Sequence, residues 1–439
     1  MMKLLYICED YVPPVTNGSG LVYLACLEAL AQEYDVYSIM FADDLGRVGR
    51  ETSDKLESLC KAHLVLPGVN RNPPVQLART LSRAVTGQLI APTMLEEMGR
   101  SGIQDKVARF IRNNAPAAMY VHKYNCVPRL GRDIVASFSG VRILDLHDDF
   151  VAKEGLERSA LQRLLREYPE LRKYAPYARI DLKNRLSRFS AIASRRQELE
   201  ILSMFDWVVA ASDNEARAYS TYLPGRVVYC PWPVSSSAGL APSRESKYAA
   251  GFIGSDMIFN LEGLMAFVTK ELPHIRQRDP RFTFVVAGGI SEPFRLACPL
   301  HDTLGVTVLG RLRDIAEFYS SVSVVVVPLL HGTGISLKTL EAASYGIPVV
   351  STPVGVRGIP SSRLPSNLVV VDLNGFSQMM TATAARWHRT QSGTTQAEET
   401  AAYLGKIAGI VTSYGVQNGS PYSAPAPLRS VGSFRRHSS

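Results

Sequence analysis

Residues 325–358 decide the fold, and they read VVVPLLHGTGISLKTLEAASYGIPVVSTPVGVRG. The initial β-branched run has the composition of a strand that is buried on both faces. A Gly-rich loop then leads into a predicted helix over 336–345, which a Gly and a Pro terminate. The apolar run that begins at Pro348 predicts the next strand. Strand, loop, helix and strand in this order are typical of an α/β protein with a parallel sheet.

The loop and the start of this helix are suited to a nucleoside diphosphate. Backbone N–H groups at a Gly-rich turn, together with the positive end of the helix dipole, attract phosphate. Lys338 lies in the first helical turn, and Glu341 follows about one turn later, where its carboxylate can accept hydrogen bonds from ribose hydroxyls. The candidate donor-binding residues in this stretch are Thr333, Gly334, Ile335, Ser336, Lys338 and Glu341.

The pattern G-T-G-x-x-x-K-x-x-E-A followed by G-x-P-V-V-S-T resembles the retaining glycosyltransferases of family 4, also called group 1. The resemblance covers most of residues 1–375. It implies the GT-B fold, in which two Rossmann-like doubly wound domains face each other across a cleft. It also implies a nucleotide-sugar as co-substrate, no cofactor, no bound metal ion and retention at the anomeric carbon. This family often shows two glutamates separated by seven residues, and Thr333 occupies the position of the first.

The remainder of the chain is consistent with two α/β domains joined by a Pro- and Ser-rich linker. The predicted strands are 3–8, 35–40, 63–66, 118–121, 142–147, 207–211, 226–230, 250–253, 282–287, 306–309, 322–327, 348–351 and 368–371. The predicted parts are an acceptor domain (1–232), a linker (233–247), a nucleotide-sugar domain (248–375), C-terminal helices that pack back on the first domain (376–413) and a disordered basic tail (414–439).

Composition narrows the class of protein. With 439 residues, 46% hydrophobic and 20% charged, the chain is expected to be a soluble globular protein with a large core. The short apolar start is followed at once by Glu9 and Asp10, which predicts a first strand and not a signal peptide. The 6 cysteines are scattered without a C-x-x-C pair, so we expect reduced core thiols, no structural zinc and a cytoplasmic location.

Two segments of the first domain are candidates for the cleft. Gly18, Ser19 and Gly20 precede a helix predicted near Leu21. In the related transferases this loop faces the donor phosphate or the acceptor, and glycines allow the backbone to approach a bound group closely. The equal alternative is a plain turn in which Ser19 caps the helix. His147 ends a predicted strand, and such strand ends face the ligand crevice in open α/β sheets. In similar enzymes a histidine here touches the donor sugar, which makes His147 a candidate catalytic residue, with a core or surface role as the alternative.

The second domain offers two further candidates. Gly254 and Ser255 follow a predicted strand, and related enzymes place this backbone beside the donor diphosphate. Arg311 follows another strand and can pair with phosphate, although a solvated arginine at a helix start explains it equally well. The candidate catalytic residues are thus His147, Lys338 and Arg311.

The basic charge is concentrated in residues 158–196. This segment holds 11 basic and 3 acidic residues, a difference of 8 that equals the net charge of +8. Its leucines predict helices with an apolar face. Two interpretations stay open: a basic amphipathic surface that holds the protein peripherally on the anionic inner face of a membrane, or a solvated face of the acceptor domain. We expect no nucleic-acid partner, because no recognised nucleic-acid motif accompanies the charge.

The predicted function is transfer of a sugar from a nucleotide-sugar donor to a glycan or lipid-linked acceptor in polysaccharide biosynthesis. Chemistry of this kind needs stabilisation of the leaving diphosphate, for which the loop amides, Lys338 and Arg311 are suited. Two alternatives stay open. An epimerase of the same fold needs further carboxylates and histidines in the cleft, and a non-catalytic binding or scaffold protein is consistent with the missing first glutamate.

Overall fold

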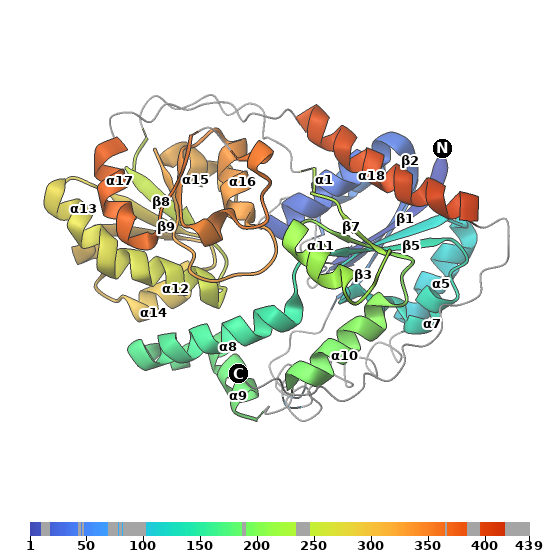
Figure 1. The fold of residues 1–439 in the computed structure, drawn as a ribbon, viewed down its shortest axis with the longest axis horizontal. Helices are drawn as coiled ribbons and strands as arrows, with labels where there is room; N and C mark the ends of the chain where they lie inside the picture. The colour runs from blue at the N-terminus through green and yellow to red at the C-terminus, as the bar shows by residue number, and fades with distance from the viewer. Residues whose placement is uncertain are drawn as a thin grey trace.

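The computed structural model describes residues 1–9, 18–42, 45, 48–68, 78, 81, 102–186, 190–233, 246–364, 367–383 and 396–417. These residues form two parallel sheets, each flanked by helices (Figure 1). The predicted fold class, an α/β protein with two Rossmann-like doubly wound domains, is confirmed. Every predicted strand is present, with ends that differ by at most three residues. Most of the predicted linker and tail lies outside the described residues.

The first sheet has 7 strands in the order β3-β2-β1-β4-β5-β6-β7. They are β1 (Met2–Glu9), β2 (Tyr34–Ala42), β3 (Ala62–Pro67), β4 (Ala118–His122), β5 (Val141–Leu146), β6 (Trp207–Ala210) and β7 (Val227–Tyr229). The order reverses between β1 and β4, and open α/β sheets bind ligands beyond the strand ends at such a switch point.

Helices cover both faces of this sheet. They are α1 (Gly18–Glu33), α2 (Arg50–Leu59), α5 (Ile103–Asn114), α6 (Cys126–Leu130), α7 (Arg132–Ala136), α10 (Ser190–Leu202) and α11 (Asp213–Ser220). Two further helices of this part of the chain, α8 (Phe150–Glu167) and α9 (Ala175–Leu186), contribute side chains to the core of the second domain. Alternate residues of β1 enter different cores: Tyr6 packs in the cluster that contains Leu27 of α1, and Ile7 in the cluster that contains Val107 of α5. This alternation is the period-2 pattern of a strand covered on both sides.

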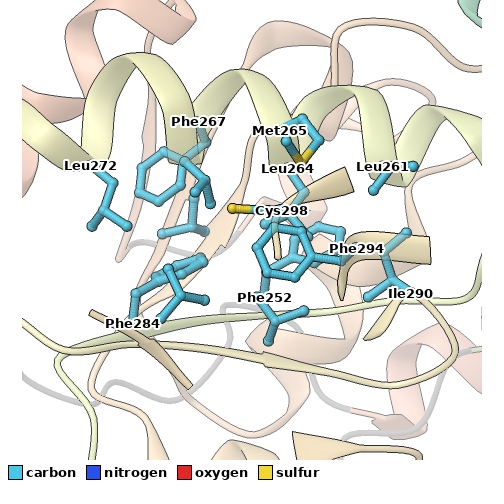
Figure 2. Close-up of a cluster of buried hydrophobic side chains, with 14 of the residues drawn as sticks. Phe252, Leu261, Leu264, Met265, Phe267, Leu272, Phe284, Ile290, Phe294 and Cys298 are labelled. Atoms are coloured by element: carbon cyan, nitrogen blue, oxygen red, sulfur yellow. The ribbon is translucent and has the colours of Figure 1, made fainter. Parts of the chain in front are cut away.

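The second sheet has 6 strands in the order β10-β9-β8-β11-β12-β13. They are β8 (Ala250–Ile253), β9 (Phe284–Ala287), β10 (Val306–Gly310), β11 (Val325–Val327), β12 (Val349–Ser351) and β13 (Leu368–Val370). The helices of this domain are α12 (Ile258–Ala266), α13 (Leu272–Arg278), α14 (Ser291–Ala297), α15 (Ile315–Ser321), α16 (Leu337–Ser344) and α17 (Phe376–Thr383). Figure 2 shows the core on one face, where side chains of α12 cover those of β8 and β9.

The helical region that follows β8 is divided in the structure. A π-helical turn at Phe267–Glu271 separates α12 from α13. Pro273 lies in the first turn of α13, and a proline inside a continuous helix lacks the N–H that the preceding turn requires. The local widening of the helix at this point is therefore a consequence of the proline.

The last helix, α18 (Gln396–Gln417), lies on the first domain. It packs against α1, and its Tyr403 and Ile407 are buried in the core that contains Tyr6 (Figure 1). By contrast, α17 packs on α13, and its Phe376 is buried with Phe267 in the second domain. The C-terminal helices were expected to pack back on the first domain. Helix α18 lies there, whereas α17 packs on the second domain.

The apolar face of the basic segment is not free. Leu161, Leu164 and Leu165 of α8 are buried in the core of the second domain, against α12. An amphipathic helix that lies on a membrane needs its apolar face for the lipid, so burial of this face disfavours the membrane interpretation. The face is buried because α8 leaves the first sheet and covers the second domain. In the described part of the chain, no helix has the length and apolar character needed to cross a membrane.

Candidate functional site

The two candidate motifs from different domains lie directly against each other. Gly334 follows β11 and has a φ of +68°, a conformation that glycine adopts without strain. A Cβ atom at this position would lie 2.7 Å from the carbonyl oxygen of His147, and nearer still to the Asp148 carboxylate. Only glycine allows the loop to approach the end of β5 this closely, so the structure brings together His147 and the Gly-rich loop.

A carboxylate of the first domain reaches across this contact. The Oε1 atom of Glu215, in α11, accepts the N–H of Gly334 at 2.6 Å and that of Asp149 at 3.2 Å. Burial of Glu215, with Asp148 nearby, raises the pKa of this carboxyl to about 7. The sequence analysis missed Glu215, because its partner lies in the other domain and far away in sequence.

Asp148 and two cations surround the same loop. Lys153 of α8 donates to Asp148 Oδ2 at 2.9 Å, and Thr333 Oγ1 lies 3.4 Å from Asp148 Oδ1. Arg357 donates from Nε to the carbonyl of Thr333 at 3.0 Å and from a terminal nitrogen to that of Val354 at 2.9 Å. Sequence reasoning missed both cations, although Arg357 lies within the stretch that decides the fold.

Lys338 and Glu341 lie on α16, partly buried beside this cluster. Burial, with the positive charges of Arg357 and Lys153, lowers the pKa of Lys338 to about 8. Burial raises the pKa of Glu341 to about 7, although the neighbouring Lys338 acts in the opposite direction. Cations that repel one another when no anion lies between them form a site that an anion stabilises.

The loop amides are engaged differently from the sequence-based expectation. The N–H of Gly334 donates to Glu215, and the N–H of Ser336 donates to the carbonyl of Arg357 at 3.1 Å. Ser336 is the N-cap of α16, and its buried Oγ has no hydrogen-bond partner within the described structure. Of the backbone amides of Gly334, Ile335 and Ser336, those of Gly334 and Ser336 therefore donate to protein acceptors and not to a phosphate.

His147 belongs to a buried polar cluster beneath the cleft. Its Nε2 lies 3.0 Å from His122 Nδ1, which lies 3.1 Å from Asp145 Oδ2. Tyr120 and Trp232 donate to the Asp145 carboxylate at 2.9 Å. Burial lowers the pKa of both histidines, well below the ordinary value for His147, so both are neutral near pH 7. His147 is 5% exposed, so its neutral imidazole is almost completely buried.

One group of side chains in this cluster has the composition of a metal site. The potential ligand atoms of Cys26, His122 and Asp145 all lie within 4.8 Å of one another, and all three residues are buried. The carboxylate of Asp145 already accepts hydrogen bonds from Tyr120 and Trp232. These hydrogen bonds account for the geometry of the group without an ion.

The remaining candidates lie at a strand end, on an exposed surface and at a helix start. Gly254 and Ser255 directly follow β8, and Asn260 of α12 donates to the carbonyl of Ser255 at 2.8 Å. Arg311 is exposed, and its guanidinium lies next to Gly289. The candidate residues of the first domain, Gly18, Ser19 and Gly20, form the first turn of α1 instead of a loop, so the helix begins earlier than predicted.

The geometry defines a GT-B protein with a cationic site on one domain and a carboxylate-rich edge on the other. Residues 247–383 match the model of the family described as Glycosyl transferases group 1. The matched stretch contains the G-T-G-x-x-x-K-x-x-E-A motif on which the predicted resemblance rests.

Solved structures of the same fold span the chain. The HepE protein of Anabaena, crystallised with UDP and glucose, aligns with a TM-score of 0.54 and 13% identity over 96% of this chain and 100% of its own. A UDP-N-acetylglucosamine 2-epimerase aligns with a TM-score of 0.51 and 11% identity over 96% of this chain and 99% of its own. At these identities the likeness shows the fold alone.

A curated relative covers less of the molecule. An uncharacterised 44.6 kDa protein of the cps region of Klebsiella pneumoniae is 25% identical over 182 residues, which are 39% of this chain. The match spans 45% of the length of that relative.

Proposed function

We propose that the protein transfers a sugar from a nucleotide-sugar to a glycan or glycolipid acceptor, with retention at the anomeric carbon. The observation that carries the proposal is the convergence of Lys338, Arg357 and Lys153 on one partly enclosed region beside Glu341. When the glycosidic bond of the donor breaks, negative charge develops on the β-phosphate. Preformed positive charge in a water-poor site stabilises that charge without further reorganisation.

In this arrangement each side chain has a separate role. Lys338 and the neighbouring cations bind the diphosphate, and the carboxylate of Glu341 accepts hydrogen bonds from the ribose. The contact between Gly334 and His147 closes the cleft beside the reacting bond and limits hydrolysis of the donor by water. His147, neutral and held by His122, offers a hydrogen bond to the sugar.

Two relatives suggest the chemical class of the substrates. HepE has been crystallised with UDP-glucose, which favours a uridine donor. The partial relative from Klebsiella pneumoniae is a protein of a cps region, which favours a polysaccharide acceptor.

Calorimetry with nucleoside diphosphates and nucleotide-sugars tests the donor site. We expect one nucleotide class to bind the wild-type protein, and Lys338→Ala to weaken this binding by roughly 10–100-fold, because a charge-assisted contact contributes ~1.5–3 kcal/mol. The control is Lys173→Ala, which removes an exposed lysine outside the site. Transfer to an acceptor glycan is then followed by NMR, which also reports the anomeric configuration. Nucleotide binding that is equal in the two variants contradicts the assigned site.

A second candidate function is epimerisation of a nucleotide-sugar. It is favoured by two carboxylates and a histidine that lie near the contact between the two domains, namely Asp148, Glu215 and His147. The discriminating experiment is incubation of the bound nucleotide-sugar without an acceptor. Appearance of an epimerised sugar, seen as a new anomeric signal in the NMR spectrum, supports the epimerase, and an unchanged donor supports the transferase.

A further inference from the structure

The position of Glu215 in the sequence predicts that its carboxylate caps its own helix. Residues 212–215 read S-D-N-E at the start of α11, and this S-x-x-E pattern is typical of a capping box, in which the glutamate folds back onto its own helix. In the structure Ser212 makes no side-chain capping bond. The Oε1 atom of Glu215 instead accepts the N–H groups of Gly334 and Asp149, one from each domain.

The second oxygen of this carboxylate is unsatisfied. Glu215 is 7% exposed, and its buried Oε2 atom has no hydrogen-bond partner within the described structure. Buried carboxylate oxygens are almost always hydrogen-bonded, because an oxygen without a donor loses its hydration and gains nothing in return. The oxygen is buried where the two domains touch, so a ligand reaches it only if the domains separate.

The charges around the loop indicate which part of a ligand this oxygen would meet. A phosphate is repelled by Glu215 and Asp148 and attracted by Lys338, Arg357 and Lys153. A nucleotide-sugar therefore binds with its diphosphate toward the cations and with its sugar toward the carboxylates. Sugar hydroxyls are O–H donors, which is what an unsatisfied carboxylate oxygen lacks.

We propose that Glu215 binds a hydroxyl group of the donor sugar through Oε2, and so supplies from the first domain the carboxylate that the Gly-rich loop lacks at Thr333. The inference rests on the proposed function, since it requires a nucleotide-sugar in the cleft. It makes Glu215 a residue that determines which sugar is accepted, because only a sugar with a hydroxyl at that position satisfies the oxygen.

The test compares sugar-dependent and sugar-independent binding. Calorimetry gives the affinities of wild type, Glu215→Gln and Glu215→Ala for UDP and UDP-glucose, and for GDP and GDP-mannose. The control is Asp213→Asn, on the same helix, whose side chain is half exposed and pairs with Arg217. Circular dichroism verifies that each variant folds, and Glu215→Gln retains a carbonyl oxygen for the Gly334 N–H.

We expect Glu215→Ala to weaken binding of the nucleotide-sugar by about 10-fold or more while binding of the nucleoside diphosphate stays the same, since an acceptor is lost only for the sugar. Glu215→Gln is expected to lie between the two, and Asp213→Asn to resemble wild type. An equal loss for both ligands overturns the inference in favour of a structural role. Tighter UDP binding by Glu215→Ala also overturns it, because the carboxylate would then compete with phosphate.

Deoxy analogues of the sugar sharpen this test. Removal of the hydroxyl that Glu215 binds should weaken binding to the wild type, with no further loss in Glu215→Ala, so that the two changes are non-additive. Additive losses for every deoxy analogue contradict a direct contact. If the wild-type protein binds neither nucleotide pair, the proposed function itself fails, and the inference fails with it.

Discussion

The two sides of the cleft recognise charge in opposite ways. On the second domain, the candidate site lies within one stretch from Thr333 to Arg357, with Lys338 and Glu341 on α16 and Arg357 after β12. On the first domain, the site is assembled from β5, α8 and α11, through Asp148, Lys153 and Glu215. The proposed phosphate-binding residues of the second domain therefore lie close together in the sequence. The residues proposed to lie near the sugar are far apart in the sequence and are brought together only by the tertiary structure.

The two sides also depend on each other. Lys153, from the first domain, lowers the pKa of Lys338, and Glu215 accepts a hydrogen bond from the opposite loop. The contact between the domains therefore satisfies the N–H of Gly334 but adds a like charge near Lys338. Substitutions made on one domain at a time show whether the two domains contribute to the site independently.

The largest effect is expected where the two sides touch. Gly334→Ala places a Cβ atom against the His147 carbonyl and forces an unfavourable positive φ, which costs on the order of 1–3 kcal/mol. We expect loss of nearly all transfer activity and a lower free energy of unfolding in urea. The matched control is Gly155→Ala in α8, where a Cβ atom meets nothing within 4 Å and alanine favours the helix. Equal stability of the two variants contradicts the close contact.

A smaller effect is expected from His147 of the first domain, which should influence turnover but not nucleotide binding. His147→Ala should lower the turnover rate by roughly 10-fold, the value of a lost hydrogen bond, with unchanged affinity for the nucleoside diphosphate. His122→Gln is expected to lower turnover less, because it removes only the support of the His147 ring. Steady-state kinetics and calorimetry are measured on the same preparations. Full turnover in His147→Ala returns this residue to a structural role.

The sequence predicted the fold well because both sheets are built from β-branched strands with Gly- and Pro-rich ends. It also located Lys338 and Glu341, since a helix start after a Gly-rich loop is a local pattern. Glu215 was missed because its S-x-x-E context predicts a helix cap, and only the tertiary structure aims it at Gly334. The two interpretations of the basic segment could not be separated from the sequence, because the leucine pattern of α8 shows that one face is apolar but not what covers it.

A moderate effect on stability is expected from the pKa of Glu215. Burial raises this pKa from 4.5 to about 7, so the native state holds the proton more tightly than the unfolded state. The stabilisation is complete below the unfolded pKa and is lost as the pH rises through about 7, by up to ~3 kcal/mol at 1.36 kcal/mol per pKa unit. Burial sets most of this effect, the charges of Asp148 and Asp149 add to it, and the hydrogen bonds from the backbone of Asp149 and Gly334 oppose it.

Urea unfolding of wild type and Glu215→Gln at about pH 5 and about pH 8 isolates this contribution. Relative to the glutamine variant, the wild type should lose stability as the pH rises. The buried histidines act in the opposite direction but cancel in the comparison, since their lowered pKa values are common to both proteins. Parallel pH profiles of the two proteins would show that Glu215 is not protonated in the native state.

The smallest effect concerns the outer surface of the basic segment. Its leucines are buried in the second domain, so a membrane can be met only by exposed charges such as those of Arg166 and Arg172. Basic residues near an anionic leaflet contribute ~1 kcal/mol each, and salt screens them within about 8 Å. We therefore expect weak binding to vesicles of phosphatidylserine at low salt, and none at physiological salt.

Replacing Arg166 and Arg172 together by Gln should remove this binding, whereas Arg281→Gln, which removes an exposed charge on the second domain, should not. Flotation of the protein with vesicles at two salt concentrations measures both. Binding that resists salt requires apolar insertion, and hence release of α8 from α12. That outcome would mean that the contact between α8 and α12 opens at a membrane. A lipid-linked acceptor would then be the first to test.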